Sequence, residues 1–303
     1  EISVITGMLA VNLLRGSKYT VVPVYLPPSG GMATGNFKGV EDFAKTELRA
    51  TPVRLEGKRL VRTGRHAKTV AEIDVALNCC HGGMGEDGTL AALLAWNGVS
   101  SASPDAPACG VFMDKSISKL AAAGLGIPVA PSFTVREQAW RAGETDAESL
   151  AETLGYPVVV KPAKLGSSIG VRVARGSAAL RSALSFAFGL DDSAVVERYF
   201  ERKRDINCAA YRRRGKVLLS PCEEVFSGGD VLSFSEKYEQ GKGSKLPADL
   251  PESLAERIRG YTKTLYEAFG MQGVVRADFL VSGDDAYFNE LNMVPGSLAG
   301  YLF

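Results

Sequence analysis

The chain has 303 residues, and its 35 Lys and Arg nearly balance its 34 Asp and Glu, which leaves a formal net charge of +1 at pH 7. Such a balance creates no strong field toward nucleic acid or an anionic membrane surface, and it favours a small-molecule ligand. Five cysteines without paired spacing argue against a disulfide framework, and no apolar run reaches the roughly 18 residues of a membrane span, so we expect a cytoplasmic protein of two or three domains.

The N-terminal part of the sequence alternates between helical and extended patterns. Helices are expected over Val4–Leu14 and Leu90–Trp96, and strands over Tyr19–Leu26 and Val75–Cys80. The second strand leads directly into the glycine-rich turn H-G-G-M-G-E-D-G-T, His81–Thr89. This alternation predicts a parallel-sheet α/β domain, which we place at residues 1–104.

A connector rich in Pro, Ala and Ser, Pro104–Pro107, marks the next domain boundary. Asp114 stands where it can cap a helix that runs through Lys119–Ala123 and ends at Gly124. Further along, we expect strands over Tyr156–Lys161 and Val171–Val173, at hairpin spacing, and a helix over Ala179–Phe188. These elements form a central domain, residues 105–196.

Strands dominate the C-terminal part, residues 197–303. They are expected over Val195–Phe200, Ile206–Tyr211, Val217–Ser220, Val274–Leu280 and Ala286–Leu291. Apolar residues at helical spacing from Leu254 to Phe269 predict an amphipathic helix that covers one face of this sheet. The opening on a helix at Glu1 and the apolar ending Tyr301–Phe303 are typical of a chain trimmed at both ends.

Four polar side chains on the last two expected strands suggest a metal site. Arg276 and Asp278 alternate on one strand, and Glu290 and Asn292 alternate on the next. Because alternate residues share a face, three oxygen-bearing side chains can converge where the strands are neighbours. Hard oxygen ligands of this kind suit Mg²⁺. The alternative interpretation is two strands that carry ordinary solvated charges.

Two glycine-rich turns are candidates for ligand binding. In K-P-A-K-L-G-S-S-I-G-V, Lys161 ends an apolar strand and the turn after it could hold phosphate on its backbone N–H groups, although a plain hairpin explains the same pattern. His81 follows a strand at the edge where α/β sheets place ligands. A structural role for His81 is the alternative, and Glu86 and Asp87 could be acids that only favour the start of a helix.

Taken in order, these stretches resemble the D-alanine–D-alanine ligase family and its ATP-grasp fold. The resemblance covers nearly the whole chain. Its motifs are E-I-S-V-I-T-G at Glu1, M-D-K at Met113, K-P-A-K-L-G-S-S-I-G at Lys161, S-E-K-Y at Ser235, R-A-D at Arg276 and N-E-L-N-M-V-P-G at Asn289. The resemblance implies an α/β fold, with an N-terminal parallel-sheet substrate-binding domain followed by a two-part ATP-grasp fold whose last part carries the metal site.

The resemblance also implies roles for individual residues in binding the nucleotide. Lys115 and Lys161 would contact the phosphates of ATP, Lys237 would add a further positive charge, and the turn with Ser168 would cover the phosphates. The adenine would lie in the segment with Glu197, Tyr199 and Phe200, and the ribose contact would be Asp205, where the family more often has Glu.

The remaining implied roles concern the metal and the substrates. Asp278, Glu290 and Asn292 would bind Mg²⁺, with Mn²⁺ as an alternative. Arg276 and the backbone N–H of Gly296 would hold the oxyanion, Ser167 and Tyr238 would be linked by hydrogen bonds to an N-terminal Glu that receives the first amino group, and His81 would bind substrate. Ser297 and Leu298, in S-L-A-G-Y-L-F where the family commonly has a Ser/Thr- and His-containing turn, are the nearest candidates for binding the second carboxylate.

The implied reaction joins two D-alanines through an acyl phosphate, as a step in making peptidoglycan precursors. Tyr238 beside Lys237 resembles the dipeptide-forming members, and D-serine, D-lactate or another amine as the second substrate is the alternative. An alternative of another class is a nucleotide-binding module without the reaction. The implied partners are small-molecule substrates and a second copy of the chain, with no nucleic acid and no membrane.

Overall fold

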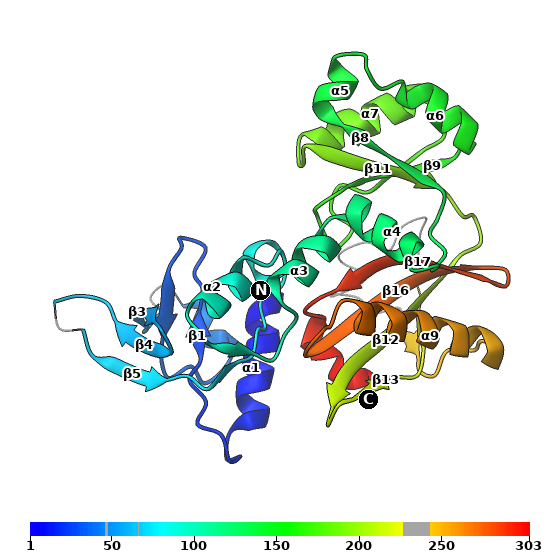
Figure 1. Cartoon of the computed structure of the whole chain (residues 1–303). Helices are drawn as coiled ribbons and strands as arrows, with labels where there is room; N and C mark the ends of the chain where they lie inside the picture. The colour runs from blue at the N-terminus through cyan, green and yellow to red at the C-terminus, as the bar shows by residue number, and fades with distance from the viewer. Residues whose placement is uncertain (46–47, 66, 227–242) are drawn as a thin grey trace. The chain divides into compact units, whose positions relative to one another are not determined.

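Figure 1 shows the computed structural model, which describes residues 1–45, 48–65, 67–226 and 243–303. The chain divides into two compact units. Unit 1 comprises Glu1–Cys109, Met271–Val275 and Met293–Tyr301, and unit 2 comprises Gly110–Gly270, Arg276–Asn292 and Leu302–Phe303. No helix in the described part of the chain is long and apolar enough to cross a membrane.

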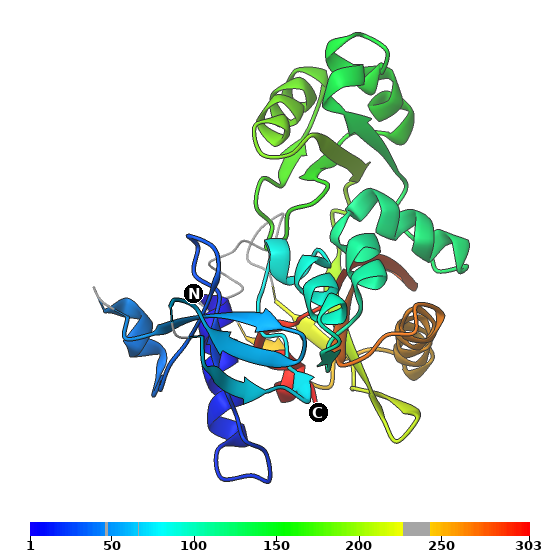
Figure 2. The same cartoon turned by 60° about the vertical axis from the view of Figure 1, so that its left-hand side comes forward.

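Unit 1 begins with the expected helix and continues into an antiparallel sheet. Helix α1 spans Ile2–Leu14. The sheet has the order β1-β2-β3-β4-β5, and Figure 2 turns it toward the viewer. Its strands are Val24–Tyr25, Met32–Thr34, Thr51–Glu56, Arg59–Arg62 and Thr69–Glu72, with the 3₁₀ helix η1 over Val40–Ala44 between β2 and β3. The side chains of Val53, Leu60 and Val61 are buried in it.

The strands β2 to β5 were not predicted, and two expected strands are shorter than expected. The run Tyr19–Leu26 forms a strand only at Val24–Tyr25, because Pro23 has no N–H for a ladder. The run Val75–Cys80 pairs only at β6, Val75–Ala76, since the Asn78 side chain accepts from the Cys80 N–H at 2.9 Å and turns the chain.

The predicted parallel pairing in unit 1 is present between β6 and β7, Ser100–Ser101. The helices η2, Gly83–Gly85, and α2, Thr89–Trp96, lie between these two strands in the sequence, as the predicted alternation requires. Helix α3, Ala106–Met113, follows and carries Pro107 in its first turn. Proline is tolerated there because the first N–H groups of a helix have no intrahelical partner, so the predicted connector forms part of a helix.

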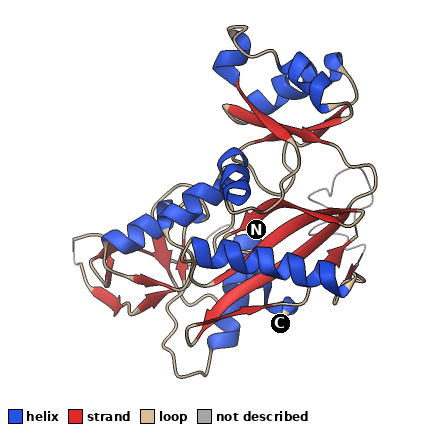
Figure 3. Cartoon of the chain, turned by 45° about the vertical axis from the view of Figure 1, so that its right-hand side comes forward, coloured by secondary structure: helices blue, strands red, loops and turns tan. Residues whose placement is uncertain are grey.

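The first half of unit 2 is a four-stranded antiparallel sheet of order β10-β9-β11-β8. Its strands are β8, Ser132–Arg136; β9, Val158–Pro162; β10, Arg172–Ala174; and β11, Ser193–Arg198. The helices are α4, Lys115–Gly124; α5, Glu137–Arg141; α6, Ala147–Leu154; and α7, Ser177–Phe188. Figure 3 shows helices covering one face of this sheet, where Val158, Val160, Ala194 and Val196 pack in the core.

Alternation along β9 and β11 separates this core from the polar groups. Because Val158 and Val160 face the helices, Val159 and Lys161 point to the opposite face. Glu197 on β11 follows the same rule, and the register pairs Val195 with Lys161 and Glu197 with Val159. One strand pair therefore carries an apolar core on one side and a charged pair on the other.

The second half of unit 2 is a sheet of order β15-β14-β12-β16-β17, in which β13 also pairs with β12. Its strands are β12, Arg204–Arg213; β13, Lys216–Leu219; β14, Glu223–Val225; β15, Ser244–Lys245; β16, Val274–Ser282; and β17, Asp285–Asn292. Helix α9, Glu252–Ala268, covers one face with Leu254, Ile258 and Leu265 buried, as the apolar spacing predicts. The 3₁₀ segment η3, Gly296–Leu302, follows β17. All five cysteines are free, as expected.

Candidate active site

The register of β16 and β17 brings together the four polar residues that the sequence singled out. Arg276 lies opposite Asn292, and Asp278 lies opposite Glu290. Alternate residues share a face, so all four side chains leave the same face of the sheet. A register shift follows between Asp278 and Phe279. The predicted placement of these side chains on one face of neighbouring strands is therefore confirmed, and their role as metal ligands stays a prediction.

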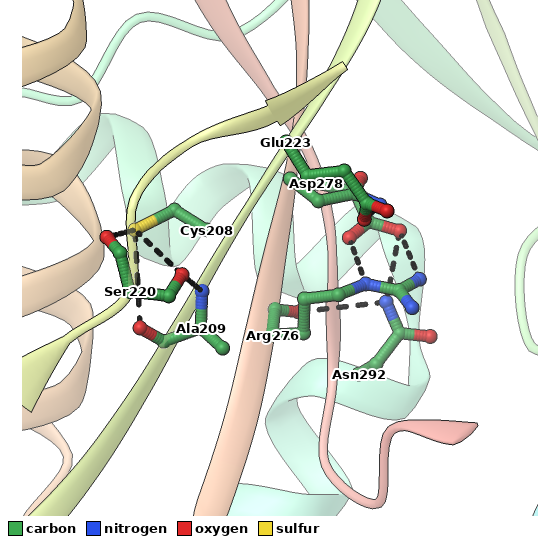
Figure 4. Close-up of polar contacts among 8 residues, drawn as sticks. Cys208, Ala209, Ser220, Glu223, Arg276, Asp278 and Asn292 are labelled. Atoms are coloured by element: carbon green, nitrogen blue, oxygen red, sulfur yellow. Dashed lines mark hydrogen bonds and ion pairs between the residues drawn. The ribbon is translucent and has the colours of Figure 1, made fainter. Parts of the chain in front are cut away.

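The carboxylate of Asp278 is held by two neighbours. Arg276 donates from Nε to Oδ1 at 2.7 Å and from Nη2 to Oδ2 at 2.8 Å, and Asn292 donates from Nδ2 to Oδ2 at 3.0 Å (Figure 4). Asp278 is 9 % exposed, so the bidentate guanidinium compensates a carboxylate that has lost most of its water. The same contacts fix the orientation of the Arg276 guanidinium.

The donor set suits a hard divalent cation. Asp278 and Glu290 supply carboxylate oxygens, and Asn292 supplies an amide oxygen. This is the chemistry that Mg²⁺ takes from proteins, with water and phosphate oxygens completing its shell. In the described ranges, no group of three or more His, Cys, Asp or Glu side chains offers a competing metal site. The residues present therefore fit Mg²⁺.

A second acidic group lies on the same sheet and was not predicted. Glu223 on β14 is 4 % exposed, and its Oε2 accepts from Asn207 Nδ2 at 3.3 Å. Asn207 and Glu223 are register partners, and β12 stands between β14 and β16. The sequence does show a polar residue inside each of two strands, Asn207 in β12 and Glu223 in β14. Strand alternation alone, however, does not tell which face of the sheet these two side chains occupy.

The lysine side of the site is built around one buried carboxylate. Glu197 is 1 % exposed, its Oε2 lies 2.9 Å from Lys119 Nζ, and its Oε1 is paired with Lys161 Nζ. Lys161 Nζ also donates to Asn289 Oδ1 at 2.9 Å. Burial alone would raise the pKa of Glu197, but the charges of Lys119 and Lys161 outweigh it and hold the pKa at about 2.

Lys115 joins the same part of the fold through the backbone. Asp114 caps α4 by accepting from the N–H of Ser116 at 2.8 Å, as predicted. The Lys115 N–H donates to Ala163 O at 2.9 Å, and its Nζ donates to Leu165 O. The first turn of α4 is therefore fastened to the segment that follows Lys161.

The glycine-serine turn after β9 has an unusual backbone. Ser167 and Ser168 have φ values of 54° and 58°, in the left-handed region, where a residue other than glycine costs about 1 kcal/mol. Gly170 has φ 78°, and a Cβ there would lie 2.7 Å from Pro162 Cγ and 2.8 Å from Leu190 Cδ1. The turn is therefore a specified structure, and strain of this kind is concentrated at functional sites.

The residues assigned to adenine and ribose follow β11. Glu197 lies in this strand, while Tyr199 and Phe200 come after its end at Arg198. Phe200 stacks on Tyr287 with ring centroids 4.9 Å apart. Asp205, on β12, accepts from Lys203 Nζ at 2.5 Å.

In unit 1, His81 lies at the N-terminal end of α1. Its Nε2 is 2.8 Å from Thr6 Oγ1, and its N–H donates to Ser3 Oγ at 2.9 Å. Thr6 Oγ1 also accepts from the Ser297 N–H at 3.2 Å, which leaves the threonine proton available for His81 Nε2. Histidine, helix terminus and the start of η3 thus form one hydrogen-bonded group.

Glu86 joins the glycine turn to the segment after β17. Its Oε2 accepts from the Gly82 N–H at 2.6 Å, and its Oε1 accepts from the Val294 N–H at 3.1 Å. A role limited to the helix macrodipole is therefore wrong for Glu86. Asp87 does act locally, since its Oδ1 accepts from the Thr89 N–H at 2.8 Å at the start of α2.

The segment assigned to the second substrate is strained. Ser297, Leu298 and Ala299 have φ values of 51°, 50° and 48°, three consecutive left-handed residues directly after Gly296. Ala299 is fully buried, which holds the segment in place. Lys237 and Tyr238 lie outside the described residues.

The side chains that the sequence analysis missed share one property: they act on other protein groups. Thr6, Asn207, Glu223 and Asn289 fall into this class, as does Lys119. Lys119 had a further signal in the sequence, because it follows Lys115 by one helical turn and so shares its face of α4.

Both halves of the chain match profiles of a known protein family. Residues 1–103 match the profile described as D-ala D-ala ligase N-terminus, and residues 121–300 match D-ala D-ala ligase C-terminus. The D-alanine--D-alanine ligase of Thermosipho africanus (strain TCF52B) is 32% identical over 321 residues, covering 100% of this chain and 84% of that protein. The corresponding ligase of Kineococcus radiotolerans is 35% identical over 324 residues, covering 97% and 85%.

A solved structure agrees in fold. The crystal structure of D-Alanine-D-Alanine Ligase from Helicobacter pylori superposes with a TM-score of 0.82 at 28% sequence identity. The superposition covers 100% of this chain and 89% of that one. The predicted fold class, with its ATP-grasp part, is confirmed.

Proposed function

The chain belongs to the D-alanine–D-alanine ligase family, and from this premise we propose how its residues join two molecules of D-alanine with the use of ATP. It is a ligase that forms a carbon–nitrogen bond in the synthesis of peptidoglycan precursors. The single observation that carries this function is the match of both halves of the chain to the two profiles of the family. The finer assignments below are supported by the geometry of each unit.

Nucleotide binding is assigned to the lysine side of unit 2. Lys115 and Lys161 are the proposed phosphate contacts. Lys115 Nζ donates to Leu165 O, directly before the glycine-serine turn, and Lys161 Nζ is held by Glu197 and Asn289. Ser168 in that turn is the proposed phosphate cover, and Lys237 remains a proposed further cation. The segment with Glu197, Tyr199 and Phe200 and the carboxylate of Asp205 are proposed for adenine and ribose.

The metal is assigned to β16 and β17. Asp278, Glu290 and Asn292 are the proposed ligands of Mg²⁺, or of Mn²⁺, because these three oxygen-bearing side chains leave the same face of neighbouring strands. Bound there, the metal would neutralise charge on the phosphate oxygens during phosphoryl transfer. The carboxylates of Asp278 and Glu290 would thus contribute to phosphoryl transfer by holding the metal ion beside the phosphates.

The reaction has two steps. The carboxylate of the first D-alanine attacks the γ-phosphorus of ATP, forming an acyl phosphate and ADP; the amine of the second D-alanine then attacks the acyl carbonyl, and phosphate leaves. Arg276 and the Gly296 N–H are the proposed donors to the oxyanion formed in the second step. Support for Arg276 is its fixed guanidinium, held at 2.7 and 2.8 Å by Asp278.

Substrate binding is assigned to single residues on the basis of the resemblance. His81 is proposed for the first D-alanine, because Thr6 and Ser3 fix its ring and backbone. Ser167 and Tyr238 are proposed to position the same substrate. Ser297 and Leu298 are proposed for the carboxylate of the second substrate, supported by the strained backbone after Gly296. A homodimer and a cytoplasmic location, which the resemblance implies, stay predictions.

The test is phosphate release with ATP, Mg²⁺ and D-alanine, with D-alanine, D-serine or D-lactate supplied as acceptor and products identified by mass. We expect D-alanyl-D-alanine as the main product. A dipeptide with D-serine, or an ester with D-lactate, in preference to the D-alanine product would move the second substrate to that acceptor. No phosphate release with any acceptor would contradict the ligase function.

A further inference from the structure

A buried cluster of three charged side chains lies behind the proposed nucleotide site. Lys119 Nζ and Lys161 Nζ each pair with a different oxygen of Glu197, the first at 2.9 Å. Their side chains are 5 %, 11 % and 1 % exposed for Lys119, Lys161 and Glu197. The three residues come from α4, β9 and β11, so the cluster joins three elements of unit 2.

Lys119 cannot itself contact a ligand. Its Nζ has essentially no solvent-accessible surface, and it faces the Oε2 of Glu197. Lys161 is more accessible, and its Nζ lies between Glu197 Oε1 and Asn289 Oδ1, 2.9 Å from the latter. The direct ion pair of Lys119 is with Glu197, so an influence of Lys119 that is passed on by contact reaches Lys161 through Glu197.

The pairing of the two Glu197 oxygens explains what Lys119 adds to the cluster. One buried carboxylate facing one lysine would form a neutral pair, and both carboxylate oxygens would be free to draw that lysine inward. With two lysines on one carboxylate, Lys119 occupies Oε2 and only Oε1 is left to pair with Lys161. Glu197 therefore holds Lys161 Nζ through one oxygen rather than two.

We propose that Lys119 is a positioning residue for nucleotide binding, which occupies Oε2 of Glu197 and thereby keeps Lys161 Nζ at the site-facing edge of the cluster. The inference rests on the proposed function, because the contact of Lys161 with ATP is part of it. In this proposal Lys119 touches neither substrate nor metal, and it affects the affinity for ATP through the side chain of Glu197.

The main test is the steady-state kinetics of Lys119→Met, which removes the charge and keeps the length of the side chain. We expect the KM for ATP to rise about 10-fold, the factor that the loss of one charge-assisted interaction gives, with kcat changed less than about 2-fold. Lys263→Met is the matched control, since Lys263 is an exposed helical lysine in an ion pair of 3.9 Å with Glu267. The control should leave both constants unchanged.

A double-mutant cycle decides whether Lys119 acts through Glu197. In a Glu197→Gln background, Lys119→Met should raise the KM for ATP by less than about 2-fold further, because the group that relays its effect is already neutral. Full additivity of the two changes would overturn the inference. So would a Lys119→Met enzyme that melts at a lower temperature but keeps the parent KM for ATP, since that is the result of a merely structural role.

Two further variants distinguish a failure of the inference about Lys119 from a failure of the nucleotide assignment of Lys161. Lys119→Gln, which retains an N–H donor of smaller size, replaces Lys119→Met if that protein does not fold, and a parent-like KM for ATP in it would overturn the inference. Lys161→Met tests the premise: an unchanged KM for ATP would overturn the nucleotide assignment of Lys161. A raised KM in Lys161→Met beside an unchanged one in Lys119→Met would overturn the inference alone.

Discussion

Glu86 connects two backbone segments by accepting from the N–H groups of Gly82, four residues away in the sequence, and Val294, 208 residues away. Glu86→Gln replaces one acceptor oxygen with an NH₂ group, so one of these N–H groups loses its partner. We expect a loss of about 1–3 kcal/mol in the free energy of unfolding. Urea unfolding of both proteins measures the difference, with exposed Glu72→Gln as a control that should change it by less than about 0.5 kcal/mol. Equal stability of Glu86→Gln and the parent would contradict the bridging role.

Glu197 predicts a specific acid dependence of stability. Burial would raise its pKa, but Lys119 and Lys161 hold the pKa at about 2, below its ordinary 4.5. Because the folded-state pKa is depressed, the carboxylate contributes stability that is complete above about pH 4.5 and is lost as the pH falls toward 2. This contribution is about 3 kcal/mol.

The measurement is the free energy of unfolding of the parent and of Glu197→Gln between about pH 2 and pH 7. The difference between the two curves should shrink as the pH falls through this window, since the parent loses a contribution that the variant never had. Exposed Glu256→Gln is the control and should run parallel to the parent. Parallel curves for Glu197→Gln would show that its charge does not stabilise the fold.

At the residue scale, the side chains proposed to contact a ligand could be named from the sequence, and the side chains that pair with them could not. Asp278, Glu290 and Lys161 stand in motifs with their own chemistry, so the sequence identified them as candidates. Lys119 and Glu223 pair with residues far away in the sequence, and without that pairing a buried charge cannot be told from a solvated one. Their roles follow only from which strands and helices become neighbours.

At the scale of elements, the glycine-serine turn after β9 depends on one close approach. Gly170→Ala would place a Cβ 2.7 Å from Pro162 Cγ in a residue with φ 78°. We expect a loss of about 1–3 kcal/mol in stability and a raised KM for ATP, because the turn must shift. Gly166→Ala is a matched control two residues from Ser168, since its added Cβ meets no atom within 4 Å. Chemical unfolding and ATP kinetics measure both, and equal behaviour of the two variants would contradict the requirement for glycine at position 170.

Elements with a long, regular apolar pattern were predicted well. The helix expected from Leu254 to Phe269 is α9, and the two strands that carry Arg276 to Asn292 are β16 and β17 in the expected pairing. Both patterns persist over several periods, so neighbouring residues reinforce one interpretation. Strand alternation then fixed which side chains share a face.

Elements that lack such a pattern were missed. Strand β5, Thr69–Glu72, is mostly exposed on both faces, and β6 ends after two residues because Asn78 diverts the chain. Such strands are specified by their partners, whose identity is a property of the whole sheet. Local propensity therefore could not reveal the antiparallel sheet β1–β5.

At the scale of the whole molecule, the proposed catalytic groups stand where the chain passes between units. Arg276 directly follows the unit 1 segment Met271–Val275, and Asn292 directly precedes the segment Met293–Tyr301. Backbone continuity alone thus links the proposed metal ligands to the part of unit 1 that Glu86 and Thr6 hold.

Ligand-linked stability tests the metal and nucleotide assignments together. We expect a non-hydrolysable ATP analogue with Mg²⁺ to bind the folded chain, so at about 100 times its Kd it should add about 2.7 kcal/mol to the free energy of unfolding. Asp278→Asn should lose the part of this gain that depends on Mg²⁺, because it removes one of two carboxylates from the donor set, whereas exposed Glu256→Gln should keep it. Thermal unfolding with the analogue alone, Mg²⁺ alone and both together measures each part. If Asp278→Asn retained the full Mg²⁺-dependent gain, the metal would have to be held elsewhere, and the convergence of Asp278, Glu290 and Asn292 would be a feature of the fold only.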